Sequence, residues 1–440
     1  MATPDLVHFL FVLALLISAA HALGYLFSRY HQPRVIGEIL GGLLLGPTLL
    51  GAVAPELQTA LFPRTGSVPA VLEVVYQLGF LLLMFASGAE MRSFLTAGDR
   101  KVVALTSLTG LAIPFAVGLV ALAPIDTSPF RGPAGNDASF TLVFGIAVSV
   151  TSIPVISRIM FDLGIMQTSF ARVVLGVAVV EDVVLYVLLA IALALATGSQ
   201  TEPFGVPGLL GLVRGSVPHL LYHVFVTLGF LAGFLWLGPR LHQALRRFRY
   251  NLVRRGSDIG FQLVFMLGVT LAGAALGVVP LFGAFVAGIL VSSAEGEQAA
   301  LARESIRTFS FAFFIPVYFA IVGLRLDLLS GFSLSVFVPF FALACIVKAA
   351  SAYLGARLAG ESPRGSANLA VALNARGGPG IVLASVAFDA QIIDQTSYAS
   401  LVLLAVLTSL IAGSWLHRVV ESGRPLRDGD GVATRATEFG

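Results

Sequence analysis

Residues 173–196 read VVLGVAVVEDVVLYVLLAIALALA, an apolar run that contains two adjacent acids, Glu181 and Asp182. At the rise of an α-helix this run is long enough to cross a bilayer, and the acid pair falls in its first half. A charge at the centre of a spanning helix costs roughly 2.5–3.5 kcal/mol on insertion scales. We therefore expect the pair to face the protein interior or a water-filled cavity, where it can bind protons and cations.

The composition extends this picture to the whole chain. Its 440 residues are 57% hydrophobic and 12% charged, and the mean hydropathy is +0.91. A soluble globular domain carries about 25% charged residues. Apolar stretches recur from end to end, so we expect one all-α polytopic membrane protein without an attached soluble domain. The single cysteine, Cys345, excludes an intrachain disulfide and a thiolate metal site.

Stretch length and hydropathy predict about thirteen transmembrane helices. The shortest connection, at residues 277–280, separates the eighth span from the ninth. The predicted spans are residues 7–28, 35–52, 69–89, 102–123, 138–160, 171–196, 217–238, 259–277, 280–293, 308–324, 332–356, 366–388 and 397–416.

The placement of basic residues tests this count independently. Alternate predicted loops hold most of the 27 lysines and arginines, whereas the intervening loops hold only Arg64, Arg131, Arg214 and Arg325. By the positive-inside rule, the N-terminus is predicted to lie outside and the C-terminus in the cytoplasm. The arginine-rich stretch at residues 240–255 is explained as a cytoplasmic linker close to lipid headgroups, so we expect no nucleic-acid partner.

The sequence repeats a pattern seven spans later. VIGEILGGLLLG, from Val35, corresponds to LFGAFVAGILVS, from Leu281, and FASGAEMRSFL, from Phe85, corresponds to FAIVGLRLDLL, from Phe319. The glycines that match between the copies are Gly37 with Gly283, Gly42 with Gly288, and Gly88 with Gly323. Because the offset is an odd number of spans, the two copies must have opposite orientation, which is the inverted-repeat construction of secondary transporters.

This repeat divides the chain into four parts. We assign residues 1–196 to the first inverted repeat and residues 259–417 to the second. Residues 197–258 form a linker span with the arginine-rich loop, and residues 418–440 form a short cytoplasmic tail.

Two runs are predicted to interrupt their helices near the middle of the membrane. SVTSIPV begins at Ser149, where Pro154 removes a backbone donor and disturbs the carbonyl of Val150, and Thr151 and Ser152 add hydroxyls beside it. NARGGPG, residues 374–380, does the same to the twelfth span through Gly377, Gly378 and Pro379.

Irregular backbone survives in a membrane only where it lines protein or water. We therefore expect the two breaks to offer oxygen ligands to a hard monovalent cation. If the interrupted helices cross, Glu181, Asp182 and Arg376 can balance the dipoles of the half-helix ends. Ordinary packing of small residues and a kink without a site are the alternatives.

Lys348 lies inside the apolar run FALACIVKAASAYLGARL, too far from its ends to reach water easily. A buried lysine requires a carboxylate, and Glu181 is the available partner. This pairing would leave Asp182 free to exchange a proton for a metal cation. A purely structural ion pair is the competing explanation.

Other polar residues in or near the spans carry weaker signals. Glu38 is expected to organise its helix, and Glu73 and Glu90 lie close enough to span ends to be solvated. His219 and His223 share one helix face, as two metal ligands can, but no third ligand is near in sequence. Placement at the membrane interface explains them better than metal binding, with pH sensing as a minor option.

Four segments together resemble cation:proton antiporter family 2, which comprises bacterial Na+/H+ antiporters and potassium-efflux relatives. The resemblance covers nearly all of residues 5–420. The segments are QPRVIGEILGGLLLGPTLLG (residues 32–51), FLLLMFASGAEM (80–91), SVTSIPVISRIMFDLG (149–164) and FFIPVYFAIVGLRLDL (313–328).

The resemblance implies a fold and a set of roles. The fold would be the sodium/proton antiporter fold, a homodimer with a dimerisation scaffold and a core domain that carries the ion by an elevator-like shift. Asp182 matches the ion-carrying aspartate, and Lys348 matches the lysine that pairs with the preceding acid in electrogenic members. Thr151 and Ser152 match the polar residues of the interrupted helix. Glu181 is a departure, because relatives commonly have Asp, Asn or Gln at that position.

We therefore expect an electrogenic secondary transporter that exchanges Na+ or Li+ for protons, in a bacterial inner membrane. A charge moved through the membrane field is worth about 2.3 kcal/mol per 100 mV, so an uneven ratio lets voltage drive export. K+/H+ exchange and a passive cation channel are the alternatives. No mid-span cluster of nucleophiles indicates an enzyme. We expect no cofactor, and the lack of a following nucleotide-binding domain argues against nucleotide gating.

Overall fold

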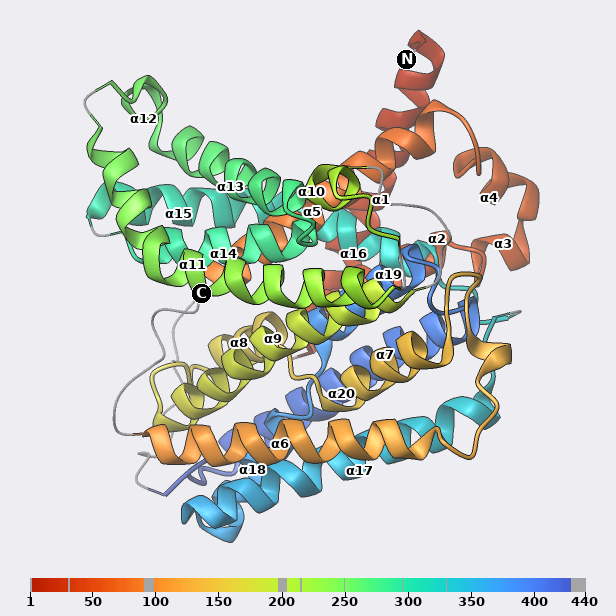
Figure 1. Cartoon of the computed structure of the whole chain (residues 1–440). Helices are drawn as coiled ribbons and strands as arrows, with labels where there is room; N and C mark the ends of the chain where they lie inside the picture. The colour runs from red at the N-terminus through yellow and green to blue at the C-terminus, as the bar shows by residue number, and fades with distance from the viewer. Residues whose placement is uncertain are drawn as a thin grey trace. The chain divides into compact units, whose positions relative to one another are not determined.

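The computed structural model describes residues 2–30, 32–90, 99–196, 204–213, 216–248, 250–294, 296–329 and 331–428. Within these ranges the regular structure is helical, apart from one isolated antiparallel bridge between Arg131 and Ile393. Figure 1 labels the helices along the chain.

The helices follow one another with short connections. They are α1 (Thr3–Arg29), α2 (Arg34–Leu45), α3 (Leu50–Val53), α4 (Pro55–Leu61), α5 (Ser67–Glu90), α6 (Arg100–Ala121), α7 (Asp137–Ser149), α8 (Ile153–Asp162), α9 (Ser169–Leu195), α10 (Gly205–Leu209), α11 (Val217–Arg247), α12 (Leu252–Gly256), α13 (Asp258–Ala275), α14 (Pro280–Ser292), α15 (Glu297–Phe309), α16 (Ile315–Leu324), α17 (Leu334–Ala359), α18 (Pro363–Ala372), α19 (Gly377–Asp389) and α20 (Gln395–Glu421). Short 3-10 and π-helical turns occupy Ser128–Phe130 and Ser310–Phe314.

Eleven helical stretches in the described residues are long and apolar enough to cross a membrane, and α7 and α14 are shorter apolar helices. Together they account for every predicted span. The predicted split between the eighth and ninth spans is confirmed, because α13 ends at Ala275 and α14 begins at Pro280. Gly277 has a φ of +83° in the turn between them, a conformation that favours glycine.

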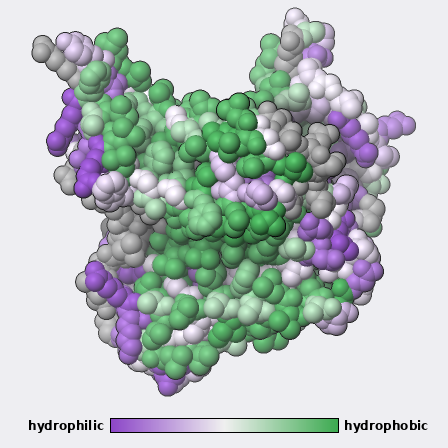
Figure 2. Space-filling model, in the orientation of Figure 1, coloured by the Kyte–Doolittle hydropathy of each residue, from purple (hydrophilic) through white to green (hydrophobic). Residues whose placement is uncertain are grey.

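The outward faces of the helices are apolar. Val120 is 71% exposed and Trp236 is 72% exposed. Hydrophobic residues cover most of the face that Figure 2 shows, and hydrophilic residues gather in separate groups toward its margins. Exposed apolar surface on this scale is expected of helices that face lipid.

Both predicted helix interruptions are present. α7 ends at Ser149 and α8 begins at Ile153, so the break precedes Pro154, which lies in the first turn of α8. Proline is tolerated there because the first helical N–H groups have no partner within the helix. α18 ends at Ala372 and α19 begins at Gly377, with Pro379 in the first turn.

One predicted span differs in its internal structure. The tenth, at residues 308–324, continues without a gap from α15 through the π-helical turn Ser310–Phe314 into α16. The spanning stretch therefore begins earlier than predicted, at Glu297.

Contacts divide the chain into two compact units, each built from three separate segments. Unit 1 contains Met1–Ala22, Glu38–Ser93 and Thr197–Arg325, and unit 2 contains Leu23–Gly37, Phe94–Ala196 and Leu326–Gly440. Both interrupted helices, α9 and α17 belong to unit 2, where α6 and α17 run side by side (Figure 1). The limits of the two repeats are a different kind of division, and they stay a prediction.

Glycines form two equivalent helix crossings within unit 1. A methyl group at Gly42 would overlap the carbonyl of Ala320, and one at Gly323 would overlap the carbonyl of Ile39. Glycine allows two backbones to approach this closely in a membrane.

The second crossing joins α5 to α14. A methyl group at Gly288 would overlap the carbonyl of Phe85, and one at Gly88 would overlap the carbonyl of Phe285. Gly42 matches Gly288 and Gly88 matches Gly323 in the sequence repeat, so the matched glycines make the same contact twice. This is the arrangement that an internal repeat requires.

Candidate ion-binding site

The acid pair lies on α9, near the middle of the helix. The hydroxyl of Thr168 accepts a hydrogen bond from the Ala171 N–H and so starts the helix. Glu181 is 1% exposed and Asp182 is fully buried. Within unit 2, α9 packs against α6 and against both interrupted helices, α7–α8 and α18–α19. The acids therefore lie inside protein, as predicted.

Glu181 forms a buried ion pair with Lys348. The Lys348 Nζ lies 2.8 Å from each carboxylate oxygen of Glu181, and both side chains are fully buried. The same ammonium donates to the carbonyl of Gly110, at 2.8 Å, and to that of Ser149, at 2.5 Å. A buried charge is tolerated when it is paired and hydrogen-bonded in this way.

The Gly110 carbonyl is available because of the sequence of α6. Its helical partner would be the N–H of residue 114, which is Pro114 and has none. A methyl group at position 110 would also come within 3.2 Å of the Glu181 Oε1. The i, i+4 spacing of Gly110 and Pro114 was a readable signal that the sequence-based argument did not use.

The open end of α7 faces two cations. Arg376 donates from Nε to the carbonyl of Ala147, at 2.9 Å, and from Nη2 to that of Val148, at 2.8 Å. Lys348 binds the next carbonyl, that of Ser149. The last carbonyls of a helix lack partners in the helix and carry its negative dipole end, so two positive side chains stabilise this terminus.

Arg376 also joins neighbouring elements. It is 1% exposed, and it donates to the carbonyl of Ala344 on α17, at 2.8 Å, and to the side-chain oxygen of Asn374, at 2.5 Å. This one side chain therefore connects α7, α17 and the break between α18 and α19. Asn374 was quoted in the predicted break but not assigned a role.

The two helix breaks bond directly to each other. Thr151 donates its hydroxyl to the Leu373 carbonyl, at 2.5 Å, and the Ser152 N–H donates to the Ala375 carbonyl, at 2.8 Å. The Gly378 N–H donates to the Ser152 hydroxyl oxygen, at 3.1 Å. Both Thr151 and Ser152 are fully buried, and their hydroxyl groups already connect the breaks.

Glycine at position 377 makes this close meeting possible. Its φ is +30°, and a methyl group there would meet the Ser152 Oγ at 2.8 Å and the side chain of Val155. Pro379 contributes by lacking the N–H that would otherwise bond to the carbonyl of Ala375.

Asp182 contrasts with its neighbour. Both of its carboxylate oxygens are buried, and neither has a hydrogen-bond partner among the described residues. An ionised carboxylate in such a place is costly, and a proton or a bound cation removes that cost. The arrangement thus separates a compensated acid, Glu181, from an uncompensated one, Asp182.

Several other predicted residues lie away from this cluster. Glu73, in unit 1, pairs with Arg325 at 2.7 Å and is 44% exposed, in keeping with its place near a span end. Glu38, also in unit 1, is 7% exposed. Glu90 closes α5, and its side chain is outside the described part.

The two histidines of α11 contact each other within unit 1. The Nε2 atoms of His219 and His223 are 3.1 Å apart. The described residues contain no group of three or more histidine, cysteine, aspartate or glutamate side chains that could hold a metal ion. The pair therefore lacks a third protein ligand within the described residues.

These features define a polytopic helical membrane protein with two interrupted helices that meet beside buried acids. Residues 12–422 match the family described as "Sodium/hydrogen exchanger, transmembrane". The chain belongs to this family and is an integral membrane protein.

Similar proteins agree with this assignment. Cation/H(+) antiporter 18 of Arabidopsis thaliana is 29% identical over 430 residues, covering 97% of this chain and 50% of the plant protein. Na(+)/H(+) antiporter NhaS4 of Synechocystis sp. (strain ATCC 27184 / PCC 6803 / Kazusa) is 29% identical over 425 residues, covering 95% and 98%. The chain thus spans half the length of the plant relative and nearly all of the cyanobacterial one.

A solved structure shares the fold. The sodium proton antiporter MjNhaP1 from Methanocaldococcus jannaschii matches with a TM-score of 0.63 at 13% identity, covering 94% of this chain and 98% of the other. The predicted fold class is confirmed.

Proposed function

We propose that the protein exchanges a monovalent cation for protons across a membrane, with Asp182 as the residue that carries either one. The observation that supports this most directly is the buried Asp182 carboxylate, whose oxygens have no partner in the described residues. It lies on the one helix that packs against both breaks. The relatives named as cation/H(+) and Na(+)/H(+) antiporters support the same activity.

The residues around Asp182 have supporting roles in this proposal. The Glu181–Lys348 pair is internally neutral, so it leaves the charge at Asp182 to be balanced by the transported ion. Arg376 holds the end of α7 in place, so the break can offer oxygen atoms without unfolding. Thr151 and Ser152 join the breaks and contribute hydroxyl oxygens near them.

Finer features of the activity are part of the proposal. We propose Na+ or Li+ as the exchanged cation, an uneven proton ratio that makes exchange electrogenic, and an elevator-like movement in a homodimer. K+ is the alternative cation. We also propose a bacterial inner membrane with the N-terminus outside and the C-terminus in the cytoplasm, supported by the arginine distribution. We propose no enzymatic activity.

Transport by purified protein in liposomes with an internal pH dye tests the activity. Imposed gradients of Na+, Li+ and K+ are applied separately, and proton movement that requires one of these gradients supports exchange. Cation flux without proton movement would instead favour a channel. Repeating the assay with an imposed voltage tests electrogenicity, because only unequal exchange responds to it.

Asp182→Asn tests the proposed carrier. We expect coupled transport to be lost, because an amide cannot exchange a proton for a cation. The variant should melt no lower than the wild type, since it removes a buried carboxylate. Asp126→Asn is the matched control, because Asp126 is an exposed loop residue whose loss should leave transport unchanged. Undiminished exchange in Asp182→Asn would contradict the assignment.

A further inference from the structure

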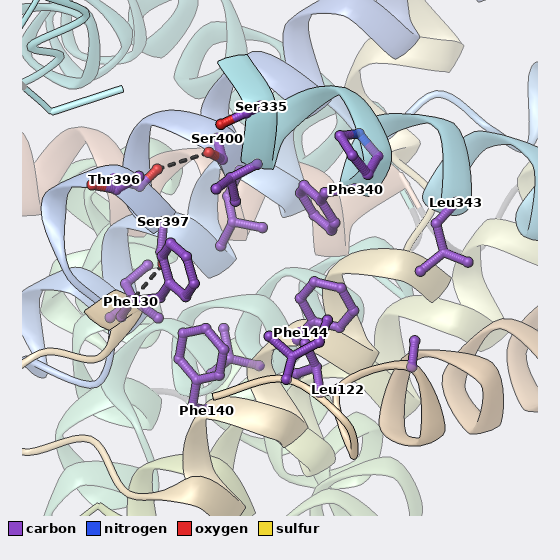
Figure 3. A pocket seen from close by; sticks show the side chains of 17 residues that line it. Leu122, Phe130, Phe140, Phe144, Ser335, Phe340, Leu343, Thr396, Ser397 and Ser400 are labelled. Carbon is purple, nitrogen blue, oxygen red and sulfur yellow. Dashed lines mark hydrogen bonds between the residues drawn. The ribbon is translucent and has the colours of Figure 1, made fainter. Parts of the chain in front are cut away.

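A second cavity in unit 2 lies among the ends of four helices. It has a volume of about 350 Å³ and is bounded by the end of α6 and the beginnings of α7, α17 and α20. Its walls are mostly apolar, with Phe140 and Phe144 from α7 and Phe340 and Leu343 from α17. Figure 3 shows these side chains around a shared space.

The polar groups of the cavity are few and already engaged. Ser397 donates its hydroxyl to the Phe130 carbonyl, at 2.9 Å, and Ser400 donates to the Thr396 carbonyl, at 2.8 Å. In Figure 3, Ser335, Thr396 and Ser400 gather at one side, opposite the phenylalanines. The cavity therefore has a hydroxyl-lined side and a larger apolar side.

Such a cavity is a poor place for water. A buried water needs about three hydrogen-bond partners, and an apolar cavity of about 150 Å³ stays dry and binds benzene. The cavity here is more than twice that size, so an apolar molecule is the favoured occupant.

The surroundings identify the class of that molecule. Val120, on α6, is 71% exposed, and Leu334 and Val338, on α17, are 65% and 53% exposed. These residues belong to spanning helices that also line the cavity, so in a bilayer they lie against lipid chains. We propose that the cavity binds one acyl chain of a membrane phospholipid, with the hydroxyl side toward the headgroup.

The position of the cavity gives a bound chain a structural role. Leu343 lines it, and the next residue, Ala344, accepts the hydrogen bond from Arg376. Phe144 lines it one turn before Ala147 and Val148, whose carbonyls also bind Arg376. A lipid chain in the cavity packs behind the parts of α7 and α17 that Arg376 connects.

Fluorescence quenching by lipid tests the proposal. Phe340→Trp places an indole in the cavity wall, in a chain whose native tryptophans, Trp236 and Trp415, are replaced by phenylalanine. The protein is reconstituted in phospholipid with brominated acyl chains, which quench indole by contact. We expect loss of most of the fluorescence, as in the lipid-facing control Val338→Trp.

Two controls define the outcome. Phe170→Trp places the indole at a fully buried position of α9 that does not line the cavity, so its quenching marks the background. Quenching of Phe340→Trp no stronger than this background, or quenching by aqueous iodide instead of bromolipid, would overturn the proposal. Leu343→Trp serves as a second reporter if Phe340→Trp does not fold.

A blocking substitution adds a matched pair. Ala121→Phe, which fills the cavity from α6, should reduce the quenching of Phe340→Trp, whereas Val120→Phe, on the neighbouring exposed residue, should not. Equal quenching in both would also contradict the proposal. Because fluorescence is the measurement, the result does not depend on whether Asp182 carries the cation.

Discussion

At the scale of single residues, the Glu181–Lys348 pair couples stability to the proposed transport chemistry. Each partner is fully buried, and the ammonium has four acceptors within 2.8 Å. Removing one partner of a buried pair costs far more than the pair contributes, because the other charge is left uncompensated.

Lys348→Ala should therefore lower the free energy of unfolding by about 3–5 kcal/mol at neutral or alkaline pH. The loss should shrink at acidic pH, since protonation neutralises the carboxylate of Glu181 that the substitution strands. Thermal unfolding at pH 8 and pH 5 measures both effects. Lys101→Ala is the control, because Lys101 is an exposed residue at the start of α6. A Lys348→Ala melting curve equal to the wild type at pH 8 would contradict the structural role of the pair.

Part of this cluster could be predicted from sequence. A lysine and an acid inside apolar runs have few other partners, so Lys348 and Glu181 could be matched without a structure. The targets of Arg376 could not be predicted, because they are backbone carbonyls on α7 and α17, and a carbonyl has no sequence identity. The Gly110 carbonyl is an exception, because Pro114 marks it four residues later.

At the scale of elements, the helix breaks were predictable and the helix crossings were partly so. Proline and glycine determine where α7 and α18 stop, because their effect on the backbone is local. The matched glycines indicated a repeat, but which helices they bring together depends on contacts between distant segments.

The crossing of α2 and α16 gives a prediction for this scale. Gly42→Ala should destabilise the protein by about 1–3 kcal/mol, because the added methyl group overlaps the Ala320 carbonyl and the backbones must separate. Gly229→Ala, at a position of α11 with nothing within 4 Å, should be neutral or slightly stabilising. Thermal unfolding of the two variants in the same detergent makes the comparison, and equal melting temperatures would argue against the close crossing.

The π-helical turn at Ser310–Phe314 is an element that the sequence did not indicate. The ring of His21 lies 2.8 Å from the carbonyl of Ala312, within the turn. A π-helical turn accommodates one additional residue in a helix, and tertiary contacts decide where it falls. The hydropathy of the stretch is the same with or without it.

At the scale of the whole molecule, the C-terminal segment is part of unit 2 rather than a loose extension. Arg427 donates to Glu361 at 2.7–3.0 Å and to Asp99 at 2.6 Å, and the Leu426 carbonyl accepts from Asn368. The hydrogen bonds to Glu361 raise the pKa of Arg427 above its usual value. This side chain therefore joins the loop after α17, the start of α6 and the end of the described chain.

Arg427→Met should consequently destabilise unit 2 by about 1.5–3 kcal/mol, the usual range for hydrogen bonds to charged groups. Arg424→Met is the matched control on an exposed neighbour. Thermal unfolding reports the difference, and a melting temperature unchanged by Arg427→Met would show that the segment contributes no stability. The sequence predicted only a short tail from residue 418, since an arginine near a terminus does not reveal its partners.

The interleaving of segments has a consequence for biosynthesis. Gly88 of α5 contacts α14, which carries Gly288, so its partner helix is translated about 200 residues later. At about 5–20 residues per second, the ribosome needs roughly 10–40 s to cover that distance. During this interval the newly inserted α5 waits in the bilayer with its glycine face against lipid. A truncated product that ends before α14 would keep that face uncovered and should be recognised by membrane quality-control proteases.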